Sequence, residues 1–225
     1  MLLDLFNLFY PRLCAACGNN LYKHEKVICL SCLYFIPKTN FHLFEDNPVA
    51  QLFWGRVNIK TATAYYYYSK GSKFQILIHK LKYNNQQEIG KQLGIMLGSQ
   101  LKDAPLYQNI TMVIPVPLHP KKEKARGYNQ SFSIAQSISD ILDIQCVSDN
   151  LFRTTESSTQ TKKSRYERFE NVNSIFKLKN PGQLSKENIL LVDDVITTGS
   201  TLEACAECIL EVDGTTVSVA ALAVA

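Results

Sequence analysis

The stretch from Ile189 to Thr201 (ILLVDDVITTGST) constrains the fold of this chain more than any other segment. It opens with four apolar residues, and a continuous apolar run suits a strand that is covered on both faces. Two adjacent carboxylates, Asp193 and Asp194, follow at the point where we expect this strand to end. A small hydroxyl-rich loop comes next, and the residues from Leu202 to Val212 have the pattern of a helix. A strand, a donor-rich loop and a helix N-terminus together predict an anion-binding site.

The side chains of this stretch suit a ligand that carries both phosphate and hydroxyl groups. Thr198, Ser200 and Thr201 can donate to phosphate oxygens, and Gly199 lets the backbone approach closely. Neighbouring carboxylates repel each other and are best tolerated when hydroxyl donors or a metal ion face them. A second interpretation stays open here: Asp194 or Thr198 caps the following helix, and the acidic pair lies in a solvated turn.

The bulk properties indicate an ordered globular protein. Its 225 residues allow one good core and a small appendage, and the apolar content of 46% argues against disorder. A net charge of +4 permits an anionic ligand without demanding nucleic acid. We find no apolar run long enough to cross a bilayer. Residues 1–10 lack a basic leader and place four apolar side chains on one helical face, so we expect a short docked helix and a cytoplasmic protein.

Four cysteines near the amino terminus predict a metal site. Cys14, Cys17, Cys29 and Cys32 form two C-x2-C pairs, a spacing that places four thiolates around a tetrahedral Zn²⁺. Four sulfur ligands close the coordination shell, so we predict a structural ion. The alternative is a pair of disulfides, but nothing else in the chain indicates secretion. A polar stretch between Pro37 and Pro48 reads as a connector, and we predict a zinc ribbon over 1–48 and a second domain over 49–225.

Another C-x2-C pair, Cys205 and Cys208, lies inside the predicted helix after the loop. Small buried core residues are the simpler interpretation, because free cysteine is among the most buried residue types. A redox pair is the alternative, although it would favour a helix N-terminus over the middle of a helix.

The rest of the body alternates strand and helix patterns. Strands are predicted at Thr61–Tyr68, Thr111–Pro117 and Asn150–Arg153, and helices at Ser72–Tyr83, at Ile89–Leu101 and from Asn129 onward. The basic cluster of Lys80, Lys82 and Tyr83 ends the first of these helices, and we interpret it as a solvated face. Between residues 119 and 130 lies a basic segment that we predict to be a loop, so a second strand–loop–helix unit follows the sheet pattern.

All thirteen positions of 189–201 resemble the phosphoribosyl-pyrophosphate (PRPP) motif of the type I phosphoribosyltransferases. The resemblance implies an α/β fold in which a mostly parallel sheet is flanked by helices. It also implies that Asp193 and Asp194 lie at the reaction centre and meet the ribose hydroxyls of PRPP, which binds together with Mg²⁺. The predicted 5′-phosphate residues are Thr197, Thr198, Gly199, Ser200 and Thr201.

The same resemblance gives the basic segment and a later loop their expected roles. In this family the loop after the first core strand holds pyrophosphate, and Arg126 and Gly127 are the best candidates here, because Arg offers a fork to phosphate and Gly lets amides approach. A merely solvated basic loop is the alternative. The region from Thr154 to Val172 has no periodicity and stands where the family has a mobile hood over the reaction centre, with Gln160, Arg165 and Arg168 as its candidate residues.

One branch of the family is matched over nearly the whole chain. The runs PVPL at 115–118 and RGYNQ at 126–130, together with the amino-terminal cysteine pairs, resemble the ComF-type competence family. Its members join a zinc ribbon to a phosphoribosyltransferase-like domain. The resemblance implies either an enzyme that transfers phosphoribose to a nitrogen acceptor or an accessory factor in DNA uptake that binds single-stranded DNA or a helicase partner. A plain base-salvage transferase is a third reading.

Overall fold

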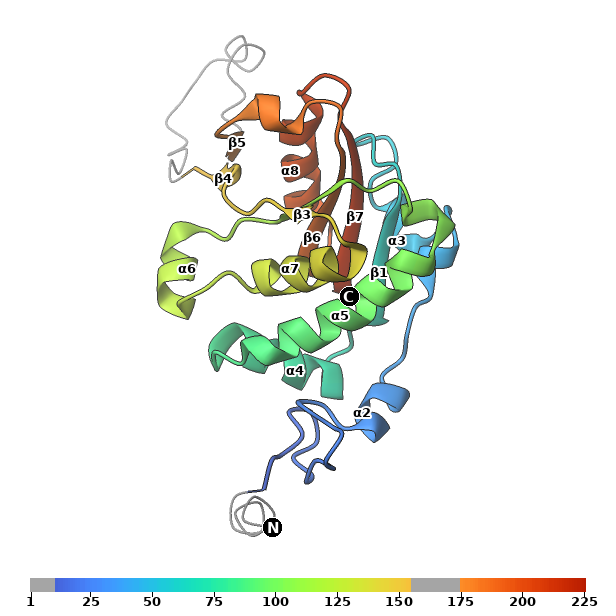
Figure 1. Ribbon diagram of the computed structural model, residues 1–225, viewed down its shortest axis with the longest axis vertical. Helices are drawn as coiled ribbons and strands as arrows, with labels where there is room; N and C mark the ends of the chain where they lie inside the picture. Colours follow the sequence, from blue (N-terminus) through green and yellow to red (C-terminus); the bar gives the residue numbers. More distant parts are fainter. Residues whose placement is uncertain (1–10, 155–174) are drawn as a thin grey trace.

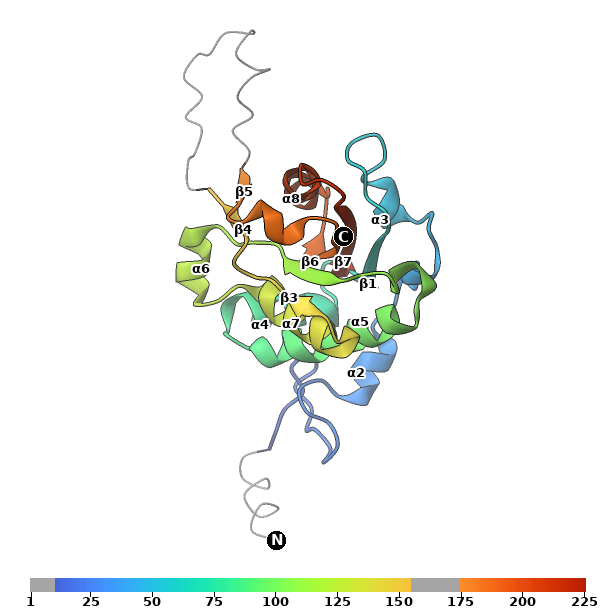
Figure 2. The same cartoon turned by 45° about the horizontal axis from the view of Figure 1, so that its top comes forward.

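The centre of the molecule is a parallel sheet with the strand order β1-β7-β6-β2-β3. The structure is a computed structural model and describes residues 11–154 and 175–225. Figure 1 shows the sheet strands, which are β1 (Ala62–Tyr67), β2 (Met112–Pro115), β3 (Gln145–Cys146), β6 (Asn188–Ile196) and β7 (Thr216–Val224). Helices cover both faces, so the sheet forms the middle layer of three (Figure 2).

The two apolar cores follow the alternation of side chains along β6. Leu190 and Val192 belong to the core beneath α4 (Lys73–Tyr83), α5 (Gln87–Asp103) and α7 (Gln130–Leu142). Ile189 and Leu191 belong to the opposite core, which α8 (Ser200–Leu210) covers. All four side chains are buried completely. A strand covered on both faces needs an unbroken apolar run, and this confirms the interpretation of the sequence.

The acidic pair lies inside β6, so the prediction that the strand ends before it was wrong. Asp193, Val195 and Ile196 continue the parallel ladder with Ala221, Ala223 and Val224 of β7. The neighbouring strand is nine residues long and supplies hydrogen-bond partners beyond the apolar run, so the backbone stays extended through both carboxylates.

The basic segment was also predicted wrongly as a loop, because it forms α6 (Pro120–Arg126). Pro120 occupies the first turn, where its missing N–H costs nothing, and the side chain of His119 accepts from the N–H of Lys121. Gly127 ends the helix at φ +80° and donates its N–H to the carbonyl of Glu123 at 2.7 Å. The sequence therefore carries complete start and stop signals for a short helix.

The remaining predicted strands and helices are confirmed with shifts of a few residues at their ends. Outside the main sheet, β4 (Leu151–Arg153) pairs antiparallel with β5 (Phe176–Leu178). The hood candidates Gln160, Arg165 and Arg168 lie outside the described residues, as does the predicted helix over 1–10. Within the described ranges, we find no helix with the length and apolarity that a membrane crossing requires.

The amino-terminal cysteine segment and α2 (Leu30–Phe35) sit beside α4 in Figure 1 and share its core. The backbone N–H of Ile28 also donates to the side chain of Gln92 on α5 at 3.3 Å. Between α2 and α3 (Pro48–Gln51) the chain crosses β1 through η1 (Phe41–Leu43). There the side chain of Asn47 donates to the carbonyl of Ala62 at 2.9 Å. The division into domains at residue 48 stays a prediction.

Candidate functional site

The acidic pair is held by groups from two helices at the carboxyl edge of the sheet. The hydroxyl of Ser131, in the first turn of α7, donates to Oδ1 of Asp193 at 2.9 Å. The backbone N–H of Asp194 donates to the same oxygen at 2.8 Å. On α4, the Nζ of Lys82 lies 3.0 Å from Oδ2 of Asp194. Each carboxylate therefore has a partner of its own, and the pair is not a solvated turn.

The charge on this pair is costly while the site holds no ligand. Burial and the neighbouring Asp194 raise the pKa of Asp193 to about 7, against the lowering effects of the Asp194 N–H, Ser131 and Lys82. Hydroxyl donors or a cation brought by a ligand would stabilise the ionised form. Its raised pKa therefore marks Asp193 as a candidate functional residue, although two donors already contact it.

Lys82 is a site residue that the sequence analysis placed wrongly on a solvated face. Its side chain is only 23% exposed and reaches the carboxylates. The signal was present in the spacing, because Lys82 follows the buried Phe74 by eight residues and the buried Ile78 by four. Residues at that spacing share one helix face. Ser131 was missed as well, and its position in the first turn of a helix after the predicted loop is the only hint that the sequence offers.

The hydroxyl-rich loop after β6 forms a small hollow of about 40 Å³ lined by Asp193 and residues 195–202. Gly199 adopts φ +76° and precedes α8, and no side chain caps this helix. Asp194 is therefore not its cap, and Oγ1 of Thr198 lies 3.0 Å from the Ser200 hydroxyl and 3.5 Å from the Ser200 N–H. The start of this eleven-residue helix lines the hollow, and the N–H groups of a helix N-terminus favour an anion.

The end of α6 brings one predicted pyrophosphate residue to the same edge. Arg126 donates to the side chain of Gln130 at 2.6 Å, and its guanidinium lies 5.2 Å from the centre of the Tyr83 ring. Gly127 serves as the helix end and does not line the cavity described next. The pyrophosphate role of both residues stays a prediction.

A cavity of about 580 Å³ unites these groups. Its charged walls are the acidic pair together with four cations, which are Lys82, Lys122, Arg126 and Arg153. Thr197 and Thr201 of the hydroxyl-rich loop form part of the same wall. A larger cavity of about 810 Å³ lies between the cysteine segment and the turn from α4 to α5, but it contains none of the predicted phosphate residues. We therefore place the candidate site in the smaller cavity.

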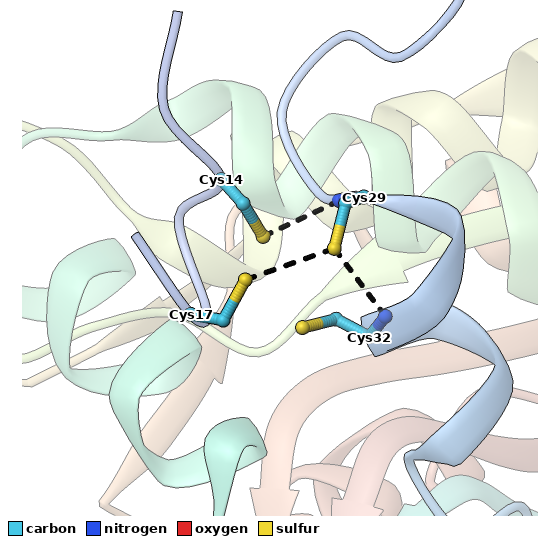
Figure 3. A group of neighbouring side chains, drawn as sticks. All are labelled: Cys14, Cys17, Cys29 and Cys32. Carbon is cyan, nitrogen blue, oxygen red and sulfur yellow. Dashed lines mark hydrogen bonds between the residues drawn. The ribbon is translucent and has the colours of Figure 1, made fainter. Parts of the chain in front are cut away.

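The four amino-terminal cysteines form a second candidate site, which is shown in Figure 3. The sulfur atoms of Cys14, Cys17, Cys29 and Cys32 all lie within 4.8 Å of one another. The Cys17 and Cys29 sulfurs are 3.8 Å apart, too far for a disulfide and close to the edge of a tetrahedron with Zn–S bonds of about 2.3 Å. All four thiols are free, so the disulfide alternative is not supported.

Backbone donors favour the thiolate form of Cys14 in this cluster, whereas burial raises the pKa of Cys29 and Cys32. The N–H groups of Ala16 and Cys29 point at the sulfur of Cys14 at 3.4 and 3.3 Å, and that of Cys32 points at the sulfur of Cys29 at 3.4 Å. Burial alone would raise the pKa of Cys14, but these backbone donors and that of Cys17 lower it to about 6. The donor set fits a structural Zn²⁺.

The later pair of cysteines belongs to the core, as predicted. Cys205 and Cys208 are buried in α8, and burial raises the pKa of both thiols. Thiols with raised pKa values are poor nucleophiles, which disfavours the redox alternative.

The carboxyl-terminal part of the chain matches a known protein family. Residues 129–224 match the family model described as the phosphoribosyl transferase domain. Competence protein F of Haemophilus influenzae is 35% identical over 131 residues, which cover 56% of this chain and 57% of that protein. The chain is a homologue of the ComF-type competence proteins. The predicted type I phosphoribosyltransferase fold is confirmed by the domain match and the parallel sheet.

Two further similarities were found. The DNA utilization protein YhgH of Escherichia coli O157:H7 is 29% identical over 215 residues, which cover 92% of this chain and 88% of that protein. Glutamine PRPP amidotransferase of B. subtilis, complexed with ADP and GMP, superposes with a TM-score of 0.46 at 19% identity. That superposition covers 64% of this chain and 30% of the amidotransferase. The alignment with competence protein F spans little more than half of that relative's length.

Proposed function

We propose that this ComF-type homologue binds PRPP with Mg²⁺ and transfers its phosphoribosyl group to a nitrogen acceptor, with release of pyrophosphate. One observation carries the proposal: the acidic pair, the hydroxyl-rich loop and Arg126 converge on one cavity edge. PRPP has phosphate groups at both ends and hydroxyls between them, so its site needs phosphate-binding groups on both sides of hydroxyl acceptors. The phosphoribosyl transferase domain match supports the same ligand.

The loop, the acidic pair and the cations each have a proposed role. The hollow formed by residues 197–201 holds the 5′-phosphate through backbone N–H groups and hydroxyls. Asp193 and Asp194 accept hydrogen bonds from the ribose hydroxyls. Arg126 and Lys82, two of the cations that line the cavity, face the pyrophosphate. When bound, Mg²⁺ neutralises part of the pyrophosphate charge, with oxygen ligands supplied mostly by PRPP and water.

The chemistry requires no protein nucleophile. The bond between the anomeric carbon and pyrophosphate breaks with its electron pair leaving on the pyrophosphate oxygen, and the acceptor nitrogen forms the new bond to that carbon. The protein contributes by orienting the two reactants and by stabilising the developing charges. In this proposal the cations of the cavity stabilise the leaving pyrophosphate, and the carboxylates orient the sugar; that both line one cavity supports it.

A non-catalytic role in handling DNA is the second candidate. The names of the relatives, competence protein F and DNA utilization protein, favour it. In this non-catalytic role PRPP binds without turnover, and the protein contacts single-stranded DNA or a helicase of the uptake machinery. With either function we propose a cytoplasmic location, because cysteines that form no disulfide suit a reducing compartment.

Thermal unfolding with Mg²⁺ and PRPP tests the ligand. Binding raises the melting temperature of the wild type, and the double variant Asp193→Asn, Asp194→Asn loses that rise. Asp140→Asn is the matched control, because Asp140 is an exposed carboxylate on α7 that bonds only to Gln136 among the described contacts. No rise with the wild type would overturn the assignment. Pyrophosphate release from PRPP in the presence of pooled bases and nucleic acids then separates the enzyme from the accessory factor.

A further inference from the structure

Arg56 connects three segments that the proposed PRPP site does not explain. It lies just after α3 and is not among the residues that line the main cavity. Its Nη1 donates to the carbonyls of Leu52 at 3.0 Å and Thr198 at 3.1 Å. Its Nη2 contacts the hydroxyl of Ser200 at 3.5 Å, and Nε and Nη2 form a two-pronged ion pair with Glu203 on α8.

These contacts use all the hydrogen-bonding capacity of the guanidinium group. An arginine side chain has five N–H donors in a fixed plane, and each finds an acceptor here. A surface ion pair alone would stabilise the fold very little. The additional contacts to Thr198 and Ser200 fall on the predicted 5′-phosphate loop, so the arrangement does more than join two surface charges.

A second residue of the same segment, Phe53, packs against the loop. Gly199 adopts φ +76°, and a Cβ placed on it would lie 3.2 Å from the ring of Phe53. Phe53 itself is buried. Its segment is fixed to the sheet by Asn47, which caps α3 and bonds to the carbonyl of Ala62 in β1. The outer side of the loop is thus supported from β1 through α3.

We propose that Arg56 is a positioning residue for the 5′-phosphate loop. In a trans peptide the carbonyl of one residue and the N–H of the next point in opposite directions. By holding the Thr198 carbonyl, Arg56 keeps the Gly199 N–H on the side turned away from itself. Arg56 also contacts the Ser200 hydroxyl oxygen, which lies 3.0 Å from the hydroxyl of Thr198. Holding the Thr198 carbonyl and this pair of hydroxyls keeps the loop in one conformation, with the Gly199 N–H available to an anion.

This inference rests on the proposed function, and it can fail separately from it. The test measures binding of PRPP with Mg²⁺, of ribose 5-phosphate and of inorganic pyrophosphate with Mg²⁺ to the full chain by calorimetry. Lysine has three donors without the planar fork, so Arg56→Lys cannot replace these contacts. Losing two loop hydrogen bonds at about 1 kcal/mol each weakens the two 5′-phosphate ligands about tenfold or more. Pyrophosphate binding stays at the wild-type level.

Two other variants complete the experiment. Glu203→Gln keeps an acceptor oxygen for the guanidinium and leaves the loop contacts in place, so it binds ribose 5-phosphate within about threefold of wild type. Arg12→Lys is the control arginine, because Arg12 bonds only to the carbonyls of Tyr22 and Lys23 in the cysteine segment among the described contacts. Its binding of all three ligands is unchanged.

The binding measurements separate the positioning role of Arg56 from the proposed function. If Arg56→Lys binds ribose 5-phosphate as tightly as wild type, or loses pyrophosphate to the same degree, the positioning role is refuted while the proposed function stands. If the wild type binds neither PRPP nor ribose 5-phosphate, the proposed function fails, and the role of Arg56 fails with it. A melting temperature of unliganded Arg56→Lys within a few degrees of wild type shows that the variant is folded.

Discussion

Replacement of Lys82 by methionine tests how the acidic pair is held. The ammonium lies 3.0 Å from the Asp194 carboxylate, with the two side chains 23% and 10% exposed. At this separation an effective dielectric constant of about 20 gives a bare attraction of about 5 kcal/mol. Desolvation offsets much of that, and removing one partner of a fully buried pair costs about 3–5 kcal/mol. Partial exposure reduces the expected loss to about 2 kcal/mol, or a melting temperature lower by about 4–8 °C at pH 8.

The loss of stability in Lys82→Met depends on pH, and its direction follows from the effect of Lys82 on the pKa of Asp193. Lys82 lowers the pKa of Asp193, so its removal raises that pKa further and leaves the folded variant with more bound protons. The stability of the variant relative to wild type therefore falls as pH rises through about 7. At pH 6 Asp193 is mostly protonated in both proteins, so its share of the difference disappears and the loss of the Lys82–Asp194 ion pair remains.

Urea unfolding at pH 6 and pH 8 measures this difference. Lys91→Met is the matched control, because Lys91 pairs with Glu88 on the surface, with side chains 51% and 65% exposed, and its loss costs about 0.5 kcal/mol at most. Adding Asp194→Asn to Lys82→Met removes the unpaired charge and recovers at least about 1 kcal/mol. A Lys82 variant that loses no more than the Lys91 variant at pH 8, or loses equally at both pH values, would refute the reasoning.

Three further predictions concern ligand affinity, the loop and the metal. Affinity for PRPP with Mg²⁺ rises about tenfold from pH 6 to pH 8 in calorimetry, because Asp193 must lose its proton to accept hydroxyl hydrogens. The Asp193→Asn variant shows no such rise beyond that of PRPP itself. Gly199→Ala loses more stability in urea than Gly71→Ala, since both have positive φ but only Gly199 faces Phe53, and equal losses would contradict the contact. Purified protein contains about one Zn²⁺ per chain by elemental analysis, and Cys29→Ser loses it; a metal-free, folded wild type would disprove the metal site.

The sequence was most informative where one pattern determined one structure. The apolar run of 189–192 could only be a strand buried on both faces, and the cysteine spacing could only bring four sulfurs together. Those features depend on neighbours close in the chain, which a single sequence displays. The convergence of the acidic pair and Arg126 was also foreseeable, because they stand at or beyond the carboxyl ends of the neighbouring parallel strands β6 and β2.

The features that the sequence did not reveal depend on contacts between residues far apart in the chain. The extension of β6 to Ile196 depends on the length of β7, which the run of 189–192 does not reveal. The role of Lys82 depends on the direction in which α4 crosses the sheet, and its charge suggested solvent. Arg56 was overlooked because its acceptors lie more than 140 residues away, apart from Leu52. In each case a tertiary contact decided what the local pattern left undetermined.

The passage of β6 through the acidic pair has a thermodynamic consequence for any ligand. Because the ladder with β7 fixes the backbone at Asp193 and beyond, the conformational entropy of placing these carboxylates is lost when the sheet folds and not when a ligand arrives. Under the proposed function, Lys82 is a side chain that would have to release Asp194 before sugar hydroxyls could reach that carboxylate. The speed of that exchange, rather than any rearrangement of the sheet, would set how quickly the site accepts its ligand.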